Sequence, residues 1–438
     1  MKKNIMKKVL SQIQSHPKIT IGLIGAGIYF PLWLFSIYIH FKQVLTGVVA
    51  VPILGSDSIE YWNLALNLKQ GVFSLDPGHV YEIFRVPGYP FFVYLIISIF
   101  KTIFAVTLIQ IILTLLTAYL IYKIINLKFD SKYAIWGPIV FLLEPSVILH
   151  SLIILSDCSY VFLLLLSTYF LLKKSNNSVF LTGIILGVSV LFRPISMFLP
   201  AIYLCWYLYE FWGEYKLFLQ KFLIFWLGFL IAICPWIYRN YHIYKTISVS
   251  NITSYNFVYY NIPMYVSWKT GLSEERARQE LFARYGINEK SLRYEVVSAS
   301  STLAIKSTLK KDFISYLFFH IKKTESFFFG SSIKIVLLVY YNLVLNTVTV
   351  NYGGIWKMLI ILERLLWLIV FTLSAFALLD KKNRTFVLLC LVMIVYFAIL
   401  TGPVSYARYR LPAEPYACIV LPIVVSVLVS RYKNAIYK

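Results

Sequence analysis

The stretch LFLQKFLIFWLGFLIAICPW, residues 217–236, contains a single charged side chain, Lys221, in twenty positions. A helix of about twenty apolar residues is long enough to cross the roughly 30 Å hydrocarbon layer of a membrane. Similar stretches recur on both sides of it, and further spans are predicted at 19–39, 133–150, 155–172, 178–193, 195–211, 356–379, 385–401 and 412–430. The sequence therefore predicts an all-α polytopic membrane protein.

Composition and charge agree with this fold class. Hydrophobic residues make up 59% of the 438 residues and charged residues only 14%, which is too little polar material to cover a soluble globular protein. The formal net charge of +22 would suit a nucleic-acid-binding protein, but the Lys and Arg residues lie mostly at the ends of apolar runs. There they face lipid headgroups and orient the helices. We therefore expect membrane lipids as partners, and no nucleic acid.

The basic loops predict which side of the membrane each loop occupies. Lysines and arginines concentrate on the cytoplasmic side, which places there Lys173 and Lys174, the segment 381–384 and the C-terminal tail RYKNAIYK. The apolar stretch 89–122 is long enough for two helices, but this rule favours one net crossing. About ten spans with both termini in the cytoplasm satisfy these constraints, and the distinctive polar residues then gather on the outer face.

Two outer segments are expected to form helices that do not cross the membrane. In LSEERARQELFARYG (272–286), Ser273 can cap a helix whose charged side chains remain in water. The segment 309–350 is apolar but interrupted by lysines, which suits helices in the headgroup plane. The chain is therefore divided into an N-terminal transmembrane module at 1–236 with a first outer loop at 40–88, an outer segment at 237–355, and C-terminal helices with a cytoplasmic tail at 356–438.

Motifs of several soluble enzyme classes are absent. The sequence contains no GxSxG, P-loop or GxGxxG pattern and no CxxC pair, so hydrolase, ATPase, dinucleotide-binding and redox functions are not indicated. The six histidines lie in separate segments, and only His79, close to Glu82 and Arg85, has polar neighbours of interest. No cofactor is therefore predicted, although a divalent metal ion stays an open alternative.

The first outer loop carries an acidic and aromatic segment, GSDSIEYWNLALNLKQG (55–71). Asp57 opens a helical pattern in which Tyr61 and Ala65 recur at helical spacing. Asp57 at the N-cap, with Glu60 three residues on, is a plausible capping pair. A carboxylate at a membrane interface can also accept a proton during catalysis. Both interpretations stay open at this point.

Four separate segments place arginines on the outer face. Arg85 begins RVPGYP, Arg193 ends a span in LFRP, and Arg239 follows the end of another span in PWIYRNY. Arg408 and Arg410 lie together in SYARYRLPAEP. An interfacial arginine can simply extend to headgroup phosphates, and this alternative stays open for Arg85. A guanidinium also binds a phosphate group through a fork of donors. The convergence of these arginines predicts a site for an anionic headgroup.

Three carboxylates accompany the arginines at apolar positions. Asp157 opens a span, where it can act as a helix cap. Glu144 precedes Pro145 inside a span, so it is either a functional residue or the buried partner of an arginine. Glu414 lies near the end of an apolar span, and we expect an arginine partner for it because an unpaired carboxylate there is costly.

The order of these motifs resembles that of the bacterial GT-C glycosyltransferases. The motifs are D-x-x-x-Y-x-x-x-A (Asp57, Tyr61, Ala65), R-x-P-G-Y-P, Arg-Pro at a helix end, P-W-x-x-R-N and R-Y-R-L-P. The resemblance is greatest to the branch related to protein O-mannosyltransferases and aminoarabinose transferases, described as dolichyl-phosphate-mannose-protein-mannosyltransferase-like. It extends from about residue 19 to 430, nearly the whole chain.

This resemblance implies an inverting glycosyltransferase that moves a hexose or pentose from a polyprenyl-phosphate donor to a lipid, glycan or protein acceptor. The reaction would take place at the outer face of the bacterial inner membrane, with Asp57 as general base. Donor phosphate would be held by Arg85, Arg193, Arg239, Arg408 and Arg410. Supporting residues would be Glu60, Tyr61, His79, Glu82, Asp157 and Glu414.

The sequence departs from the family pattern in one place. The second acid beside the first-loop aspartate is replaced by Ser56 and Ser58, which disfavours a metal-dependent mechanism.

The alternative function is a transporter or a flippase for lipid-linked glycans. Such a protein would carry paired polar residues at mid-membrane depth and repeated halves, whereas the sequence shows only Glu144 there and no repeat.

Overall fold

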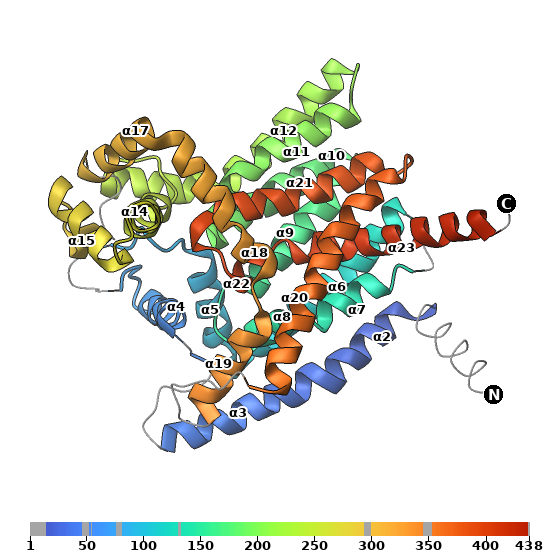
Figure 1. Cartoon of the computed structure of the whole chain (residues 1–438), viewed down its shortest axis with the longest axis horizontal. Helices are drawn as coiled ribbons and strands as arrows, with labels where there is room; N and C mark the ends of the chain where they lie inside the picture. Colours follow the sequence, from blue (N-terminus) through green and yellow to red (C-terminus); the bar gives the residue numbers. More distant parts are fainter. Residues whose placement is uncertain are drawn as a thin grey trace.

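The computed structural model consists of a helical bundle with a lobe beside it (Figure 1). It describes residues 15–45, 52–53, 55–75, 81–129, 133–292, 299–344 and 353–436, and no strand occurs in these ranges. Five described helices are long and apolar enough to cross a membrane: Pro17–Val44, Phe104–Lys128, Tyr215–Tyr244, Ile355–Leu379 and Arg384–Val404. Shorter apolar helices are Gly88–Phe100, Asp157–Leu171, Asn176–Phe192, Ser332–Tyr341 and Glu414–Val429. The predicted all-α polytopic fold class is confirmed, and the number of crossings stays a prediction.

The first half of the chain supplies the centre of the bundle. It contains α2 (Pro17–Ile24), η1 (Gly25–Tyr29), α3 (Phe30–Leu45), α6 (Phe104–Lys128), α9 (Asp157–Leu171), α10 (Asn176–Phe192) and α12 (Tyr215–Tyr244). Backbones of α10 and α12 approach closely, since a Cβ atom added at Gly183 would lie 2.1 Å from the Phe225 carbonyl oxygen. Small residues at such crossings are typical of helix contacts within membranes. This contact fixes α10, whose last turn leads into Arg193.

The C-terminal helices complete the same core. They are α20 (Ile355–Phe376), η4 (Ala377–Leu379), α21 (Arg384–Thr401), η5 (Gly402–Val404), α22 (Ala407–Arg410) and α23 (Glu414–Ile436). α23 packs against α6 and α7 (Trp136–Leu142) of the first half. A Cβ atom at Gly137 would lie 2.5 Å from the Cys418 carbonyl oxygen, so glycine permits this contact as well. Segments far apart in sequence therefore share one core.

Two predicted helical stretches are interrupted. The stretch 133–150 forms α7 and α8 (Pro145–Ser151), with Glu144 in an extended conformation between them. Pro145 explains the break, because proline disfavours a helical conformation at the residue before it. The stretch 89–122 forms α5 (Gly88–Phe100) and α6, separated at Lys101, whose φ of 56° lies in the left-handed region.

Two further spans differ from the prediction in their ends. The stretch 195–211 begins as the short 3₁₀ helix η2 (Pro194–Phe198) before α11 (Leu199–Glu210). α12 continues to Tyr244, past the expected end at 236. Arg239 therefore lies within α12, which continues beyond the predicted end of the span.

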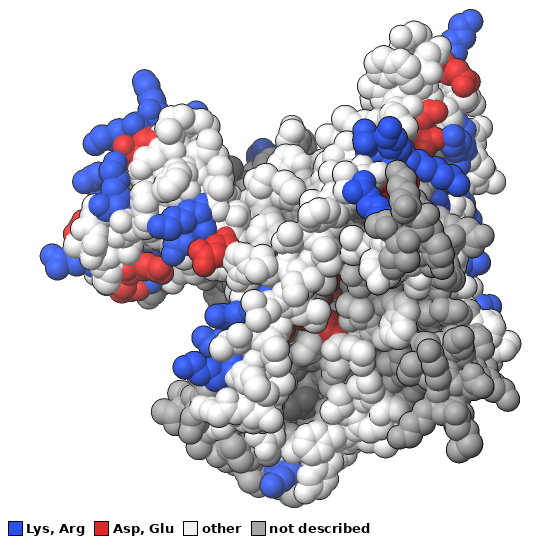
Figure 2. Space-filling model, turned by 45° about the vertical axis from the view of Figure 1, so that its right-hand side comes forward, with Lys and Arg blue, Asp and Glu red and all other residues white. Residues whose placement is uncertain are grey.

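The lobe consists of short helices between α12 and α20. They are α13 (Ile252–Asn256), η3 (Phe257–Asn261), α14 (Ile262–Thr270), α15 (Glu274–Tyr285), α16 (Glu289–Leu292) and α17 (Ala299–Lys323), and α18 (Glu325–Phe329) and α19 (Ser332–Val344) lead back to the bundle. The Ser273 hydroxyl accepts a hydrogen bond from the Arg276 backbone N–H at 3.3 Å, which confirms the predicted cap. In Figure 2 the lobe lies at the left and carries many charged side chains, with a broad uncharged surface beside it.

The two ends of the bundle carry different polar groups. At one end, Glu210 forms ion pairs with Lys128 (3.8 Å) and Lys174 (2.5 Å), so the loops rich in lysine lie together. α9 starts at Asp157 and runs toward this end, and α10 returns from it to Phe192. Asp157 and Arg193 therefore lie at the opposite end of the bundle.

Candidate active site

Helix α4 (Gly55–Leu68) carries the acidic and aromatic segment of the first outer loop. Its buried face consists of Ser58, Tyr61, Leu64 and Ala65, which follow the predicted helical spacing. Asp57 lies within the first turn and not at the N-cap, so the capping-pair interpretation is wrong. The carboxylate points instead to arginines from other segments.

Two arginines contact Asp57. Arg85 Nη2 donates to Asp57 Oδ1 at 2.6 Å, and Arg408 Nη1 donates to Asp57 Oδ2 at 2.9 Å. Arg85 also donates from Nε to Glu60 Oε2 at 2.7 Å. Each oxygen of Asp57 thus accepts a charged hydrogen bond from a different part of the chain.

Asp157 continues this pattern into the bundle. Arg408 Nη2 lies 3.0 Å from Asp157 Oδ2, and Arg193 Nη1 lies 3.0 Å from Asp157 Oδ1. We call the resulting set the arginine–carboxylate chain. In order of contact, its members are Glu60, Arg85, Asp57, Arg408, Asp157 and Arg193. Five separate segments meet in it, as the convergence of arginines predicted for Arg85, Arg193 and Arg408.

Glu82 orients Arg85 through the backbone. Its Oε1 accepts the N–H groups of Phe84 (2.7 Å) and Arg85 (2.9 Å), which fixes the turn before RVPGYP. A Cβ atom at Gly88 would lie 2.5 Å from the Leu191 carbonyl oxygen, so this segment packs directly on the last turn of α10. The close contact explains why Arg85 and Arg193 lie at the same end of the bundle.

The Arg85 guanidinium lies over the aromatic rings of Tyr61 and Phe84. The guanidinium carbon of Arg85 lies 5.1 Å from the centre of the Tyr61 ring and 5.0 Å from that of Phe84. Cations are attracted to the faces of such rings. Since Tyr61 is buried, it restricts the positions that the Arg85 side chain can occupy.

Exposure singles out Asp57 within the arginine–carboxylate chain. Its side chain is 32% exposed, compared with 10% for Arg408 and 0% for Asp157. Burial raises the pKa of Asp57, but the charges of Arg85 and Arg408 outweigh this and lower it to about 2. Asp57 is therefore ionised at neutral pH. Among the carboxylates of the arginine–carboxylate chain, it is the most accessible to solvent.

Two of the predicted arginines, Arg239 and Arg410, do not belong to the arginine–carboxylate chain. Arg239 donates to the Glu82 carbonyl oxygen (2.8 Å) and to Asn240 (2.9 Å), so it holds the turn that carries Arg85. Arg410 is fully buried and pairs with Glu414 at 2.9 Å, which confirms the predicted arginine partner of Glu414. His79 lies outside the described residues.

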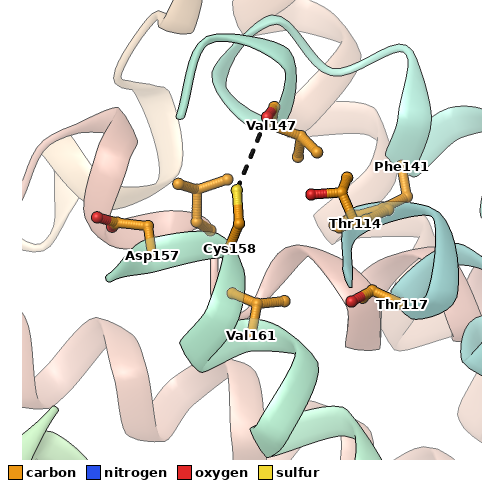
Figure 3. Close-up of a pocket in the computed structure, with 8 residues that line it drawn as sticks. Thr114, Thr117, Phe141, Val147, Asp157, Cys158 and Val161 are labelled. Carbon is orange, nitrogen blue, oxygen red and sulfur yellow. Dashed lines mark hydrogen bonds between the residues drawn. The ribbon is translucent and has the colours of Figure 1, made fainter. Parts of the chain in front are cut away.

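Asp157 is one of the residues that line a small cavity (Figure 3). The close-up shows Cys158, Thr114 and Val147 around it, and Cys158 Sγ contacts the Val147 carbonyl oxygen at 4.0 Å. Its volume of about 10 Å³ leaves space for one water molecule at most. It is too small for a sugar or a phosphate group.

Sequence analysis missed Glu363, which lies in α20 and contacts Arg410 at 3.7 Å. A carboxylate within a long apolar helix is the signal that would have found it, as it did for Glu144. Among the described residues, no group of three or more His, Cys, Asp or Glu side chains is arranged to hold a metal ion.

Comparisons with known proteins agree with this fold. Residues 85–238 match the family model of dolichyl-phosphate-mannose-protein mannosyltransferase. The structure of AglB, the oligosaccharyltransferase from Archaeoglobus fulgidus in complex with an inhibitory peptide and a dolichol-phosphate, is similar with a TM-score of 0.53 at 14% identity. The chain therefore shares the fold of AglB. The alignment covers 97% of this chain and 52% of AglB, so the chain spans about half the length of that protein.

A second similar structure is that of ArnT from Cupriavidus metallidurans bound to undecaprenyl phosphate. It has a TM-score of 0.43 at 13% identity and covers 92% of this chain and 77% of its own. No curated protein sequence matches the chain. The motif-based resemblance to GT-C proteins is confirmed, and the roles of individual site residues stay predictions.

Proposed function

We propose that this protein is a GT-C glycosyltransferase, which transfers a sugar from a polyprenyl-phosphate donor to the hydroxyl group of an acceptor with inversion at the anomeric carbon. The observation that carries the proposal is the double contact of Asp57 with Arg85 and Arg408. A proton acceptor and two phosphate-binding cations thus meet at one exposed point. The dolichol-phosphate in the AglB structure is a ligand of the same chemical class.

Asp57 acts as the general base in this mechanism. As the acceptor oxygen attacks the anomeric carbon, its O–H bond breaks and the proton passes to the Asp57 carboxylate. The bond between the anomeric carbon and the phosphate oxygen breaks on the opposite face of the sugar, and polyprenyl phosphate leaves with the electron pair. The guanidinium groups of Arg85 and Arg408 stabilise the charge that develops on the leaving phosphate.

Donor binding makes Asp57 a better base. With both arginines bound to it, Asp57 has a pKa of about 2 and accepts protons poorly at neutral pH. A donor phosphate that takes a hydrogen bond from Arg85 or Arg408 withdraws part of this stabilisation and adds a negative charge nearby. Both effects raise the pKa of Asp57. Asp57 therefore becomes a stronger base when the donor is in place.

We assign the site to the outer face of the bacterial inner membrane. The support is the separation of the lysine-rich end around Glu210 from the end that holds Asp157 and Arg193. Because lysine-rich loops favour the cytoplasm, the arginine–carboxylate chain then faces outward. On this side a lipid, glycan or protein can reach Asp57 from water while the donor chain stays in the membrane.

The test uses the purified protein in liposomes with labelled polyprenyl-phosphate hexose and pentose donors, and follows label into lipid, glycan and protein acceptors. General bases contribute about 10²–10⁴-fold to rate, so we expect Asp57→Asn to reduce transfer by this factor while donor binding persists. Asp380→Asn is the matched control, because the Asp380 side chain bonds only to Lys382 and Asn383 of its own loop among the described contacts. Undiminished transfer by Asp57→Asn would refute the proposal.

A further inference from the structure

Helix α22 consists of one turn, Ala407–Arg410, and carries two arginines. Residues two apart on a helix point in different directions. Arg408 reaches Asp57 and Asp157, whereas Arg410 reaches into the bundle. A single turn has no stability of its own, so other contacts have to determine where Arg408 lies.

Arg410 provides such contacts to four other segments. Its Nε donates to Glu414 Oε1 at 2.9 Å, and its Nη1 donates to the Gly330 carbonyl oxygen at 2.9 Å. Its Nη2 lies 3.3 Å from Glu144 Oε1 and 3.7 Å from Glu363 Oε1. We call Arg410 and these three glutamates the Arg410 clamp.

Two of the three glutamates of the clamp, Glu144 and Glu363, are held by further hydrogen bonds. Ser332 donates from its hydroxyl to Glu144 Oε1 (2.5 Å) and from its backbone N–H to Glu363 Oε1 (2.6 Å). Trp367 Nε1 donates to Glu144 Oε2 at 3.2 Å, and its ring lies 4.4 Å from the Arg410 guanidinium carbon. Two of the carboxylates that bind Arg410 are therefore restrained by other parts of the bundle.

The backbone of α22 also lies directly on the chain between α18 and α19. A Cβ atom at Gly330 would lie 2.7 Å from the Ala407 backbone nitrogen. Glycine is needed here for close approach. Both ends of α22 are thus fixed, Ala407 by this contact and Arg410 by the clamp.

Burial excludes the donor-phosphate role that the sequence suggested for Arg410. Arg410 and Glu414 are 0% exposed, and Glu144 and Glu363 are 5% and 6% exposed. Three carboxylates already surround one guanidinium, so a phosphate would add further negative charge to a closed site. Burying such a cluster of charged groups costs free energy. Its place at the end of α22, two residues from Arg408, indicates a structural role.

We propose that the Arg410 clamp positions Arg408, so that one guanidinium reaches both Asp57 and Asp157. Arg410 is then a positioning residue for the proposed transfer reaction, and the inference rests on that function for its kinetic test. When the clamp opens, α22 shifts and Arg408 loses its double contact.

The first test measures the motion of α22 and does not depend on transferase activity. A nitroxide spin label is placed at Tyr406→Cys, since Tyr406 is exposed and adjoins α22, after Ser replaces the exposed Cys205 and Cys234. We expect Arg410→Lys and Glu363→Gln each to raise the mobility of the label, and Asp380→Asn to leave it unchanged. Two clamp variants are used because either one can fail to fold. Unchanged mobility in the folded clamp variants would overturn the inference.

The second test is a double-mutant cycle on donor turnover. Misplacement of a catalytic group by about 1 Å can reduce rate by about 10²-fold, so we expect Arg410→Lys to reduce kcat/KM for the donor by about 10- to 100-fold. In an Arg408→Ala background the same change has nothing left to misplace, and we expect less than a 2-fold further loss. Full additivity of the two losses would overturn the inference, because independent sites add. A mobile label in a protein whose unaltered form transfers no sugar would support the clamp and refute the proposed function.

Discussion

Two clusters of arginine and carboxylate lie only two residues apart along α22 and have opposite properties. The arginine–carboxylate chain contains three arginines and three carboxylates and reaches the surface at Asp57, which is 32% exposed. The Arg410 clamp contains one arginine and three carboxylates and is closed. Under the proposed function, the first exchanges a carboxylate contact for a donor phosphate, whereas the second is closed to such a ligand. Access and charge balance, and not residue type, would then distinguish the phosphate site from the internal support.

The largest expected effect is on stability, at the clamp. Arg410→Ala leaves three buried glutamates without their common partner, and breaking a buried ion pair in this way costs about 3–5 kcal/mol. We expect a large fall in the free energy of unfolding, measured by denaturation in detergent micelles. Arg364→Ala on the exposed side of α20 is the matched control. Equal stability of Arg410→Ala and the native protein would remove the contrast between the two clusters.

The next effect is on rate, at the open cluster. Arg85→Ala removes one of the two cations at Asp57, and loss of a group that stabilises transition-state charge costs about 10²–10³-fold in kcat. Its partners Asp57 and Glu60 are 32% and 19% exposed, so water can replace the guanidinium and stability changes little. Transfer assays and unfolding measurements on one preparation check both parts. Arg276→Ala in the lobe, where Arg276 is 70% exposed, is the control. A large loss of stability with normal kcat would reverse our interpretation.

The third expected effect is on the pH dependence of stability, through Asp57. The pKa of Asp57 is lowered to about 2 in the folded protein, compared with about 3.9 in an unfolded chain. Since the folded pKa is the lower one, this stabilisation is present above about pH 4 and is lost as the pH falls toward 2. We expect the melting temperature of the native protein to fall more steeply over this range than that of Asp57→Asn. Parallel curves would show that the arginines do not stabilise the ionised form.

The fold class followed from the sequence because the membrane imposes one simple rule. Runs of about twenty apolar residues form helices that satisfy their own hydrogen bonds. The rule fails at Glu144 and Lys101, where apolar character continues but the helix stops. Hydropathy reports the environment of side chains, whereas these breaks depend on Pro145 and on a left-handed backbone conformation. Hydropathy also did not predict that α12 continues through Pro235 to Tyr244.

The candidate site was predicted in outline, and its internal contacts were not. Helix ends and basic loops indicated that arginines from several segments meet at one end of the bundle. They could not indicate that Arg408 contacts Asp57 while Arg410 does not, because a two-residue separation reverses direction only if the segment is helical. They also could not reveal that Arg239 binds the carbonyl of Glu82, since that contact joins segments 157 residues apart.

The smallest expected effect is in the lobe, which provides a baseline for both clusters. Ser273→Ala removes the hydroxyl that caps α15, and loss of such a cap costs about 1 kcal/mol. The cap has no contact with the arginine–carboxylate chain or the Arg410 clamp among the described interactions, so we expect normal transfer and a small fall in melting temperature. Ser273→Thr retains the hydroxyl and serves as the control. If Ser273→Ala reduced transfer while Ser273→Thr did not, the folding of α15 would be coupled to Asp57, and the site would extend from the two clusters into the lobe.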